Sequence, residues 1–305
     1  MPTIYGKKVE IIVNDQCNLC GLCVEGCPTA YLELESVKVR GGKKDSWGCL
    51  TCGHCAAICP VEAIHVEAEG IGRQDVLRFS KEKPPTYDAL FRLLVSRRSV
   101  RKFSDQPVSR DITEKILEAA QQAPAGLPPS TVKVVVLDGK EAVRSFAFDF
   151  LDAVRKMSWL FSKAGVWLLR PFMSKEEHRS MRELVVPIYK ELTHGRAQGK
   201  DLMFYDAPLA MIFACSEDPA DAGIACTYAM IAAESLGLGS CMIGTVVPML
   251  AHTSREFRER YKIAPGMRHG LAIIFGHAAG TFERGIRRRF AGISFVDRPP
   301  NTCCC

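Results

Sequence analysis

The chain has 305 residues, of which 47% are hydrophobic, and its formal net charge is +6 at pH 7. This length allows one small and one medium domain with a sizeable core. No apolar run approaches the roughly 18 residues of a membrane-spanning helix, so we expect no membrane span. The N-terminal segment has no apolar signal-peptide core, and the 14 cysteines suit a reducing compartment, so we expect a cytoplasmic protein.

Eight of the 14 cysteines form two copies of one pattern, in which three cysteines fall within seven residues and a fourth precedes a proline. The copies are Cys17, Cys20, Cys23 and Cys27, and then Cys49, Cys52, Cys55 and Cys59. Three thiolates so spaced can hold one face of a cubane cluster, while the fourth cysteine reaches the neighbouring cluster. We therefore predict two [4Fe–4S] clusters with crossed ligands: Cys17, Cys20, Cys23 and Cys59 on one, and Cys49, Cys52, Cys55 and Cys27 on the other.

A pair of structural zinc sites is the alternative for these cysteines, because zinc also uses Cys-x2-Cys pairs. Zinc needs neither the third cysteine nor the Cys-Pro ending, so the pattern favours iron–sulfur clusters and electron transfer. Each oxidised cluster with its four thiolates carries a charge of about −2, which brings the loaded protein to about +2. The net positive charge of the chain therefore indicates no nucleic-acid partner.

The two cysteine motifs lie among short β segments, expected at 9–13, 37–40 and 63–66. This arrangement resembles a bacterial two-cluster ferredoxin, and we expect such a domain over residues 1–80. Residues 81–86 are charged, contain Pro84 and Pro85 and lack apolar periodicity, which is typical of a linker. A second domain is expected over residues 87–305.

Apolar periodicity in the second domain predicts both helices and strands. The helices are expected at 87–96, 112–122, 141–156 and 222–236, and the strands at 132–137, 209–215 and 270–275. The segment from Met157 to Met173 is apolar, with only Lys163 and Arg170 as charges. We interpret it as a lid or a subunit-interface element, with peripheral membrane contact as the alternative.

A basic motif at the end of the first of these helices has the chemistry of a phosphate site. Arg97, Arg98, Ser99 and Arg101 supply bidentate donors and a hydroxyl within five residues. Alone, such a run is more often a solvated basic face. Three further motifs follow it in the chain: 123–126, 237–244 and the arginine triplet at 287–289.

This ordered set of motifs resembles the FMN-dependent nitroreductase family over residues 87–298, which implies an α+β domain that binds FMN. The positions implied for FMN are Arg97, Arg98, Ser99 and Arg101 at the phosphate and ribityl chain, Ala125 and Gly126 at the pyrimidine ring, Ile243 and Gly244 at the N5 edge, and Arg288 and Arg289 at a further phosphate contact. The chain departs from the family after Gly126, where 127–130 reads Leu-Pro-Pro-Ser in place of an Asn-containing segment. We therefore transfer no side-chain contact from that segment.

The resemblance further implies a homodimer with FMN between two subunits, in which the helix at 222–236 lies at the interface. A Rossmann site for NAD(P)H is not indicated, because Gly237-x-Gly239 follows a helix and Met242 stands where the third glycine belongs. A low-potential carrier such as ferredoxin is therefore the expected electron donor.

We expect an iron–sulfur flavoprotein enzyme in which electrons pass through two clusters to FMN, which reduces a small electron-poor acceptor. Nitroarenes, quinones, enones and halogenated aromatics all remain open as substrates. No catalytic side chain is identified, and Tyr205, Lys200 and Trp167 are candidates only for lining the substrate side. The alternatives are an electron-transfer or redox-sensing protein that passes electrons to a protein partner, and purely structural clusters with direct reduction of FMN by NAD(P)H.

Overall fold

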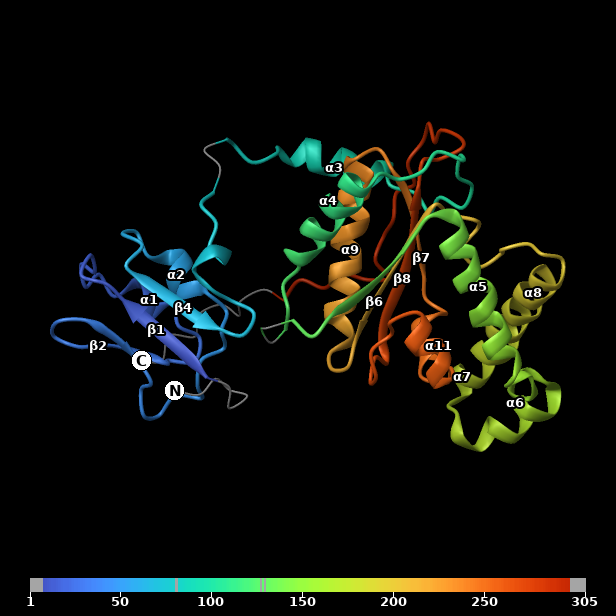
Figure 1. Ribbon diagram of the computed structural model, residues 1–305, viewed down its shortest axis with the longest axis horizontal. Helices are drawn as coiled ribbons and strands as arrows, with labels where there is room; N and C mark the ends of the chain where they lie inside the picture. Colours follow the sequence, from blue (N-terminus) through green and yellow to red (C-terminus); the bar gives the residue numbers. More distant parts are fainter. Residues whose placement is uncertain (1–7, 80–81, 127, 129, 297–305) are drawn as a thin grey trace.

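The structure is a computed structural model that describes residues 8–79, 82–126, 128 and 130–296 (Figure 1). The expected departure from the family at 127–130 lies partly outside these residues, since positions 127 and 129 are not described. Within the described part, no helix has both the length and the apolar character needed to cross a membrane.

The N-terminal elements form two small antiparallel sheets and two short helices around the cysteines. They are β1 (Val9–Val13), α1 (Leu22–Glu25), β2 (Leu32–Leu34), β3 (Val39–Gly41), α2 (His54–Ile58), β4 (Ile64–Ala68) and the 3-10 turn η1 (Arg73–Asp75). Strand β1 pairs with β4, with Val9 opposite Ala68, and β2 pairs with β3. The strands expected near 9–13, 37–40 and 63–66 are present, whereas β2 was not predicted.

The backbone of this region repeats with the 32-residue offset of the cysteines. Helix α1 follows Gly21 at φ 79°, and α2 follows Gly53 at φ 70°. The left-handed non-glycine residues are repeated too, since Leu19 corresponds to Thr51 at φ 58° and 56°. Matching backbone conformations give the two cysteine loops the same shape, as a duplicated cluster-binding unit requires.

The second region is built on a four-stranded antiparallel sheet in the order β5-β6-β8-β7. The strands are β5 (Lys133–Asp138), β6 (Leu209–Cys215), β7 (Gly239–Ile243) and β8 (His269–Gly276). Three strands match the expected ranges within one residue at each end. Strand β7 was not predicted, because its Gly-Ser-Cys-Met-Ile sequence was interpreted only as part of a flavin motif.

Helices cover both faces of this sheet (Figure 1). Strand β6 alternates between them: Met211 and Phe213 pack in the core shared with α4 (Arg110–Gln121) and α9 (Pro219–Ser235), while Ala210 and Ile212 pack with α5 (Lys140–Arg155). Both faces of β6 carry apolar side chains, and the whole strand is buried. The remaining helices of this body are α3 (Tyr87–Ser96), α10 (Val247–Leu250) and α11 (Arg255–Arg260). This α+β arrangement confirms the expected fold class.

A helical insertion separates α5 from β6. It contains η2 (Ser158–Phe161), α6 (Lys163–Leu169), η3 (Arg170–Phe172), α7 (Lys175–Ser180), a π-helical turn η4 (Met181–Val185) and α8 (Val186–Ala197). The apolar segment at 157–173 thus becomes short helices whose large side chains Trp159, Trp167 and Phe172 are exposed. Whether it serves as a lid or a subunit interface stays a prediction.

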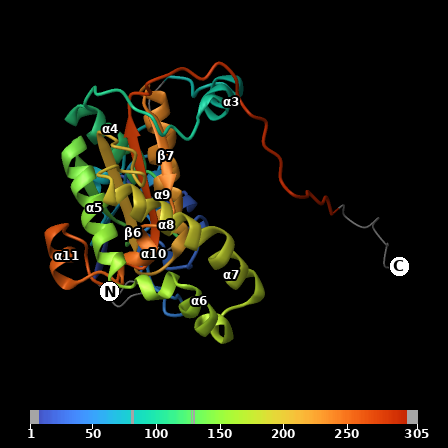
Figure 2. The ribbon, with the colours of Figure 1, turned by 90° about the vertical axis from the view of Figure 1, so that its right-hand side faces the viewer.

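The chain after β8 leaves the body as an extended tail (Figure 2). Residues 280–296 contain no helix or strand and are exposed throughout. The tail first passes the end of α3: a Cβ on Gly285 would lie 2.3 Å from Cγ1 of Val95, so only glycine fits there. Large apolar side chains such as Phe290 and Phe295 stand in solvent beyond that point.

Candidate functional site

The predicted cluster cysteines line the core of the N-terminal region. Cys23 and Cys49 are buried with Val9 and Ile64, while Cys20 and Cys52 are exposed. All 11 cysteines within the described residues are free thiols. The thiols are therefore available to metal rather than used as a disulfide framework.

Side chains from the two motifs mix in the way that crossed ligation requires. The pKa of Cys23 is raised, first by burial and then by the nearby thiolates of Cys59, Cys17 and Cys20. Cys23 therefore has the fourth cysteine of the second motif beside it, together with two cysteines of its own motif.

The second set mirrors the first. The pKa of Cys49 is raised by burial and then by Cys52 and Cys27, so the fourth cysteine of the first motif lies here. Burial, followed by Cys49, Cys52 and Cys23, raises the pKa of Cys55 to about 12. The interaction between Cys55 and Cys23 places the two sets next to each other. Each set therefore contains cysteines of both motifs, and the assignment of the eight cysteines to two clusters stays a prediction.

Backbone amides donate to the sulfurs at matching positions of the two repeats. The amide of Tyr31 lies 3.3 Å from Sγ of Cys27, and that of Ala63 lies 3.2 Å from Sγ of Cys59. Burial raises the pKa of Cys27, but the hydroxyl of Thr29 and three backbone amides outweigh it and lower that pKa overall. Such donors stabilise a thiolate, which is the form that binds iron.

Zinc and a four-iron cluster require different spacings between their cysteine ligands. Within the part of the chain that the structure describes, no three His, Cys, Asp or Glu side chains converge closely enough to hold a single metal ion. A tetrahedral zinc ion with Zn–S bonds of about 2.3 Å would bring its ligand sulfurs to about 4 Å from one another. A four-iron cubane separates its ligands more widely, and the choice of clusters over zinc rests on the cysteine pattern of the sequence.

The arginine motif is anchored to the start of β7. The amide of Val100 donates to the carbonyl of Ser240 at 2.9 Å, and Ser99 forms a parallel bridge with the same residue. A Cβ on Gly239 would lie 2.5 Å from Cγ2 of Val100, so glycine allows this close packing. At the other side, the hydroxyl of Ser96 donates to Glu234 near the end of α9 at 2.9 Å.

The arginines of this motif lack acidic partners, which suits a phosphate. Within the described residues, Arg97, Arg98 and Arg101 form no ion pair, although the first two are half-buried. One Nη of Arg98 donates to the carbonyl of Val95 at 3.0 Å, but its buried Nε has no protein partner. The buried hydroxyl of Ser240 also lacks a partner. These donors fit the terminal phosphate and ribityl hydroxyls of FMN.

Ala125 and Gly126 lie at the opposite end of α9. The amide of Gly126 donates to Oδ1 of Asp221 at 2.9 Å, in the first turn of α9. Asp221 is only 7% exposed and was missed from the sequence. The available signal was an acidic residue that starts an otherwise apolar helix.

The two remaining motifs lie elsewhere. Ile243 pairs with Ala272 at the end of β7, and Gly244 follows in an exposed turn, about 13 Å along the strand from Ser240. Arg288 and Arg289 lie in the exposed tail, beyond the point where Gly285 meets α3.

Helix α9 keeps two of the motifs apart within one chain. Glu234 lies at the end of α9 that contacts the arginine motif, and Asp221 lies at the end that contacts Gly126. Their separation of 13 positions corresponds to about 20 Å of helix. Among the substrate-side candidates, Trp167 lines a groove on the helical insertion, whereas Lys200 and Tyr205 do not. The arginine motif and Gly126 therefore lie at opposite ends of α9 in one chain.

Comparison with known proteins agrees with this architecture. Residues 94–277 match the sequence model of the nitroreductase family, and residues 10–60 match that of the 4Fe-4S dicluster domain. The chain is 28% identical over 153 residues to the FMN reductase [NAD(P)H] of Bacillus subtilis, a match that covers 50% of this chain and 53% of that protein. It thus spans about half the length of that relative.

The N-terminal region and the fold have relatives of their own. An uncharacterized ferredoxin of Methanocaldococcus jannaschii is 40% identical over 50 residues, covering 16% of this chain and 77% of the ferredoxin. The crystal structure of a nitroreductase with bound FMN from Bacteroides fragilis superposes with a TM-score of 0.51 at 18% identity, over 68% of this chain and 98% of that one. That likeness concerns the fold alone. The chain therefore belongs to the nitroreductase family and carries a 4Fe–4S dicluster domain ahead of its nitroreductase domain.

Proposed function

We propose that this protein is an iron–sulfur flavoprotein oxidoreductase that passes electrons from a low-potential donor through two [4Fe–4S] clusters to FMN, for reduction of an electron-poor organic acceptor. Bound FMN supplies the exchange between one- and two-electron chemistry. The observation that carries the proposal is the mixing of the two cysteine motifs, with Cys59 beside Cys23 and Cys27 beside Cys49, ahead of a nitroreductase domain.

The cysteines have two roles in this proposal. They hold each cluster with four thiolates, which predicts about eight irons and eight sulfides per chain after anaerobic purification. The proximity of Cys55 to Cys23 supports transfer between the clusters, because it brings the two ligand sets together. Tightly bound zinc in place of iron would contradict this part of the proposal.

The flavin residues are proposed to come from two copies of the chain. Arg97, Arg98, Ser99 and Arg101 would hold the phosphate and ribityl chain, while Ile243 and Gly244 would face the isoalloxazine. Ala125 and Gly126 would approach the same flavin from the partner copy, since about 20 Å of α9 separates them from the arginines in one chain. Arg288 and Arg289 would contribute from the tail, whose exposed apolar side chains also suit burial against a second copy.

The domain arrangement completes the proposal: residues 1–80 carry the clusters, 81–86 link, and 87–305 bind FMN. A small diffusible acceptor is proposed, as opposed to relay of electrons to a protein partner. Nitroarenes, quinones and enones share the low-lying acceptor orbital that this chemistry needs.

The test compares anaerobic reduction of FMN by reduced ferredoxin or dithionite with reduction by NADH and NADPH. The intact protein and a variant lacking residues 1–80 are loaded with equal FMN, and flavin bleaching is followed by stopped flow. Ferredoxin should reduce the intact protein quickly and the shortened variant slowly. Fast reduction of the shortened variant by NADPH would show that the clusters are not the route. Turnover of a nitroarene by the reduced protein alone would separate an enzyme from a relay.

A further inference from the structure

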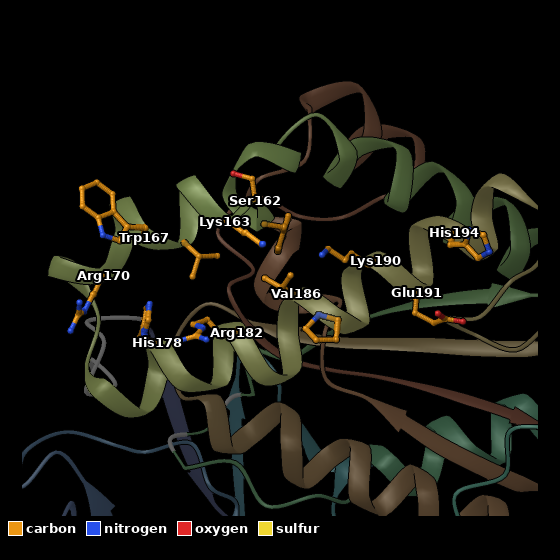
Figure 3. A pocket seen from close by; sticks show the side chains of 13 residues that line it. Ser162, Lys163, Trp167, Arg170, His178, Arg182, Val186, Lys190, Glu191 and His194 are labelled. Carbon is orange, nitrogen blue, oxygen red and sulfur yellow. The ribbon is translucent and has the colours of Figure 1, made fainter.

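A groove of about 1070 Å³ opens on the helical insertion, between α6 on one side and α7, η4 and α8 on the other (Figure 3). Its volume slightly exceeds the range of about 300–1,000 Å³ that is typical of small-molecule sites. None of the residues assigned to FMN lines it. The residues of the groove are therefore available to contact a molecule other than FMN.

The charged side chains of the groove are mostly of one sign. Lys163, Arg170, Arg182 and Lys190 line it, and Glu191 is the sole carboxylate among its lining residues. None of these four cations forms an ion pair within the described part of the chain. A concave surface with an excess of three positive charges concentrates anions.

Two acidic side chains of the neighbouring helices are already engaged. Glu183 pairs with Arg179 at 2.9 Å, one turn away on the same helical run. Glu177 accepts the amide of Ser174 at 2.8 Å in the capping box of α7. Neither of these two carboxylates is therefore free to neutralise the groove, and Glu176, the other acid of α7, does not line it.

The cations come from opposite walls and flank an aromatic surface. Figure 3 shows Lys163 of α6 and Lys190 of α8 directing their side chains toward each other across the groove. Trp167, at one end, is 71% exposed, although a large aromatic side chain gains by burial. Phe161 stacks on Tyr189 with ring centroids 4.0 Å apart, which gives the groove a rigid wall.

The backbone of one wall is irregular where it carries a cation. Arg182 lies in η4, a π-helical turn between α7 and α8. Such turns are rare inside helices and are frequently found at functional sites. The turn connects α7 to α8, which carries Lys190.

We propose that this groove binds an aromatic organic anion, a flat ring system bearing a carboxylate or phosphate group. The ring would lie against Trp167, and the anionic group would accept from Lys163 and Lys190. If the proposed function holds, this ligand class is also the class of the electron acceptor; only that last step rests on the proposed function.

Equilibrium dialysis of naphthalene-2-carboxylate against the cofactor-loaded protein tests the site. Neutral 2-naphthalenemethanol serves as the uncharged probe of the same shape. The double variant Lys163→Gln, Lys190→Gln should bind the carboxylate about tenfold more weakly, the loss expected for two exposed charge contacts. The charge-matched control Lys156→Gln, Lys175→Gln, outside the groove, should bind it as the wild type does.

Three outcomes would overturn the inference. The first is equal affinity for the carboxylate and the alcohol, and the second is an equal loss in the control variant. The third is sedimentation of the protein with vesicles containing one quarter phosphatidylglycerol and no binding of the dissolved carboxylate, which would assign the cations to a membrane surface.

Turnover separates this inference from the proposed function. With 4-nitrobenzoate and 4-nitrobenzyl alcohol as acceptors, the Lys163→Gln, Lys190→Gln variant should raise KM for the benzoate and leave that for the alcohol unchanged. Binding of the naphthoate without reduction of either nitro compound would contradict the proposed function and leave the groove intact. Reduction of both without naphthoate binding would do the reverse.

Discussion

Replacing Asp221 by alanine tests whether this buried carboxylate holds the flavin loop in place. Its Oδ1 accepts the amide of Gly126 at 2.9 Å, and the side chain is 7% exposed. A hydrogen bond to a charged group contributes about 1.5–3 kcal/mol. Since about 1.4 kcal/mol corresponds to a factor of ten, the Kd for FMN should rise by at most about 10- to 150-fold.

The assay is titration of flavin-free protein with FMN, followed by the quenching of flavin fluorescence. Asp221→Asn is the matched control, because its amide oxygen can still accept from Gly126 without the charge, so its Kd should fall between those of the wild type and the alanine variant. Thermal unfolding of the flavin-free proteins reports the effect on the fold alone. An unchanged Kd in Asp221→Ala, together with a lower Tm, would refute the reasoning and assign the carboxylate to the stability of α9.

Three further changes test other parts of the structure. Arg97→Ala should weaken FMN binding, measured by the same titration, by about 1.5–3 kcal/mol through loss of a charge-assisted phosphate contact; retention equal to wild type would remove this residue from the site. Cys59→Ser should perturb the paramagnetic resonance of the cluster held by Cys23, and a change confined to the cluster of its own repeat would show that ligation is not crossed. Tyr261→Phe should lower the Tm by several degrees, because the tyrosine hydroxyl donates to Asp149 at 2.5 Å, and an unchanged Tm would mean that this bond contributes nothing.

The same pair gives a pH dependence. Burial, followed by the hydrogen bond to Asp149 and its charge, raises the pKa of Tyr261 above its usual value near 10. The folded state therefore retains the phenolic proton at a pH where the unfolded chain releases it. The stabilisation is complete below the unfolded pKa and is lost as the pH rises toward the folded one. Tyr261→Phe has no phenol and therefore lacks this loss of stability at alkaline pH. After correction for its stability at neutral pH, the variant should begin to unfold at a higher pH than the wild type.

The features that depend on close spacing along the chain could be predicted from the sequence. Three cysteines within seven residues and a Cys-Pro ending predict cluster ligands without any knowledge of the fold, because the loop itself sets the distances. The helix at Tyr87–Ser96 and the strand at Leu209–Cys215 were likewise predicted at their observed bounds, since each carries a clear apolar pattern.

Short segments that depend on distant partners could not be predicted from the sequence. Strand β7 contains two small residues, Gly239 and Ser240, and exists because β8 pairs with it and Val100 packs on its glycine. The sequence pattern of so short a strand carries almost no signal of its own. Asp221 was missed for a similar reason, because its partner Gly126 lies 95 positions earlier in the chain.

The amino-acid sequence by itself thus determined the type of cofactor chemistry, the order of the two domains and the identity of most local motifs. Only the tertiary structure decided how those motifs lie relative to one another. It places Cys59 beside Cys23, separates Gly126 from the arginine motif by the length of α9, and gathers unpaired cations from α6 and α8 into one groove. The physical reason is that spacing along a chain sets only short distances, whereas contacts between distant segments follow from packing of the whole core.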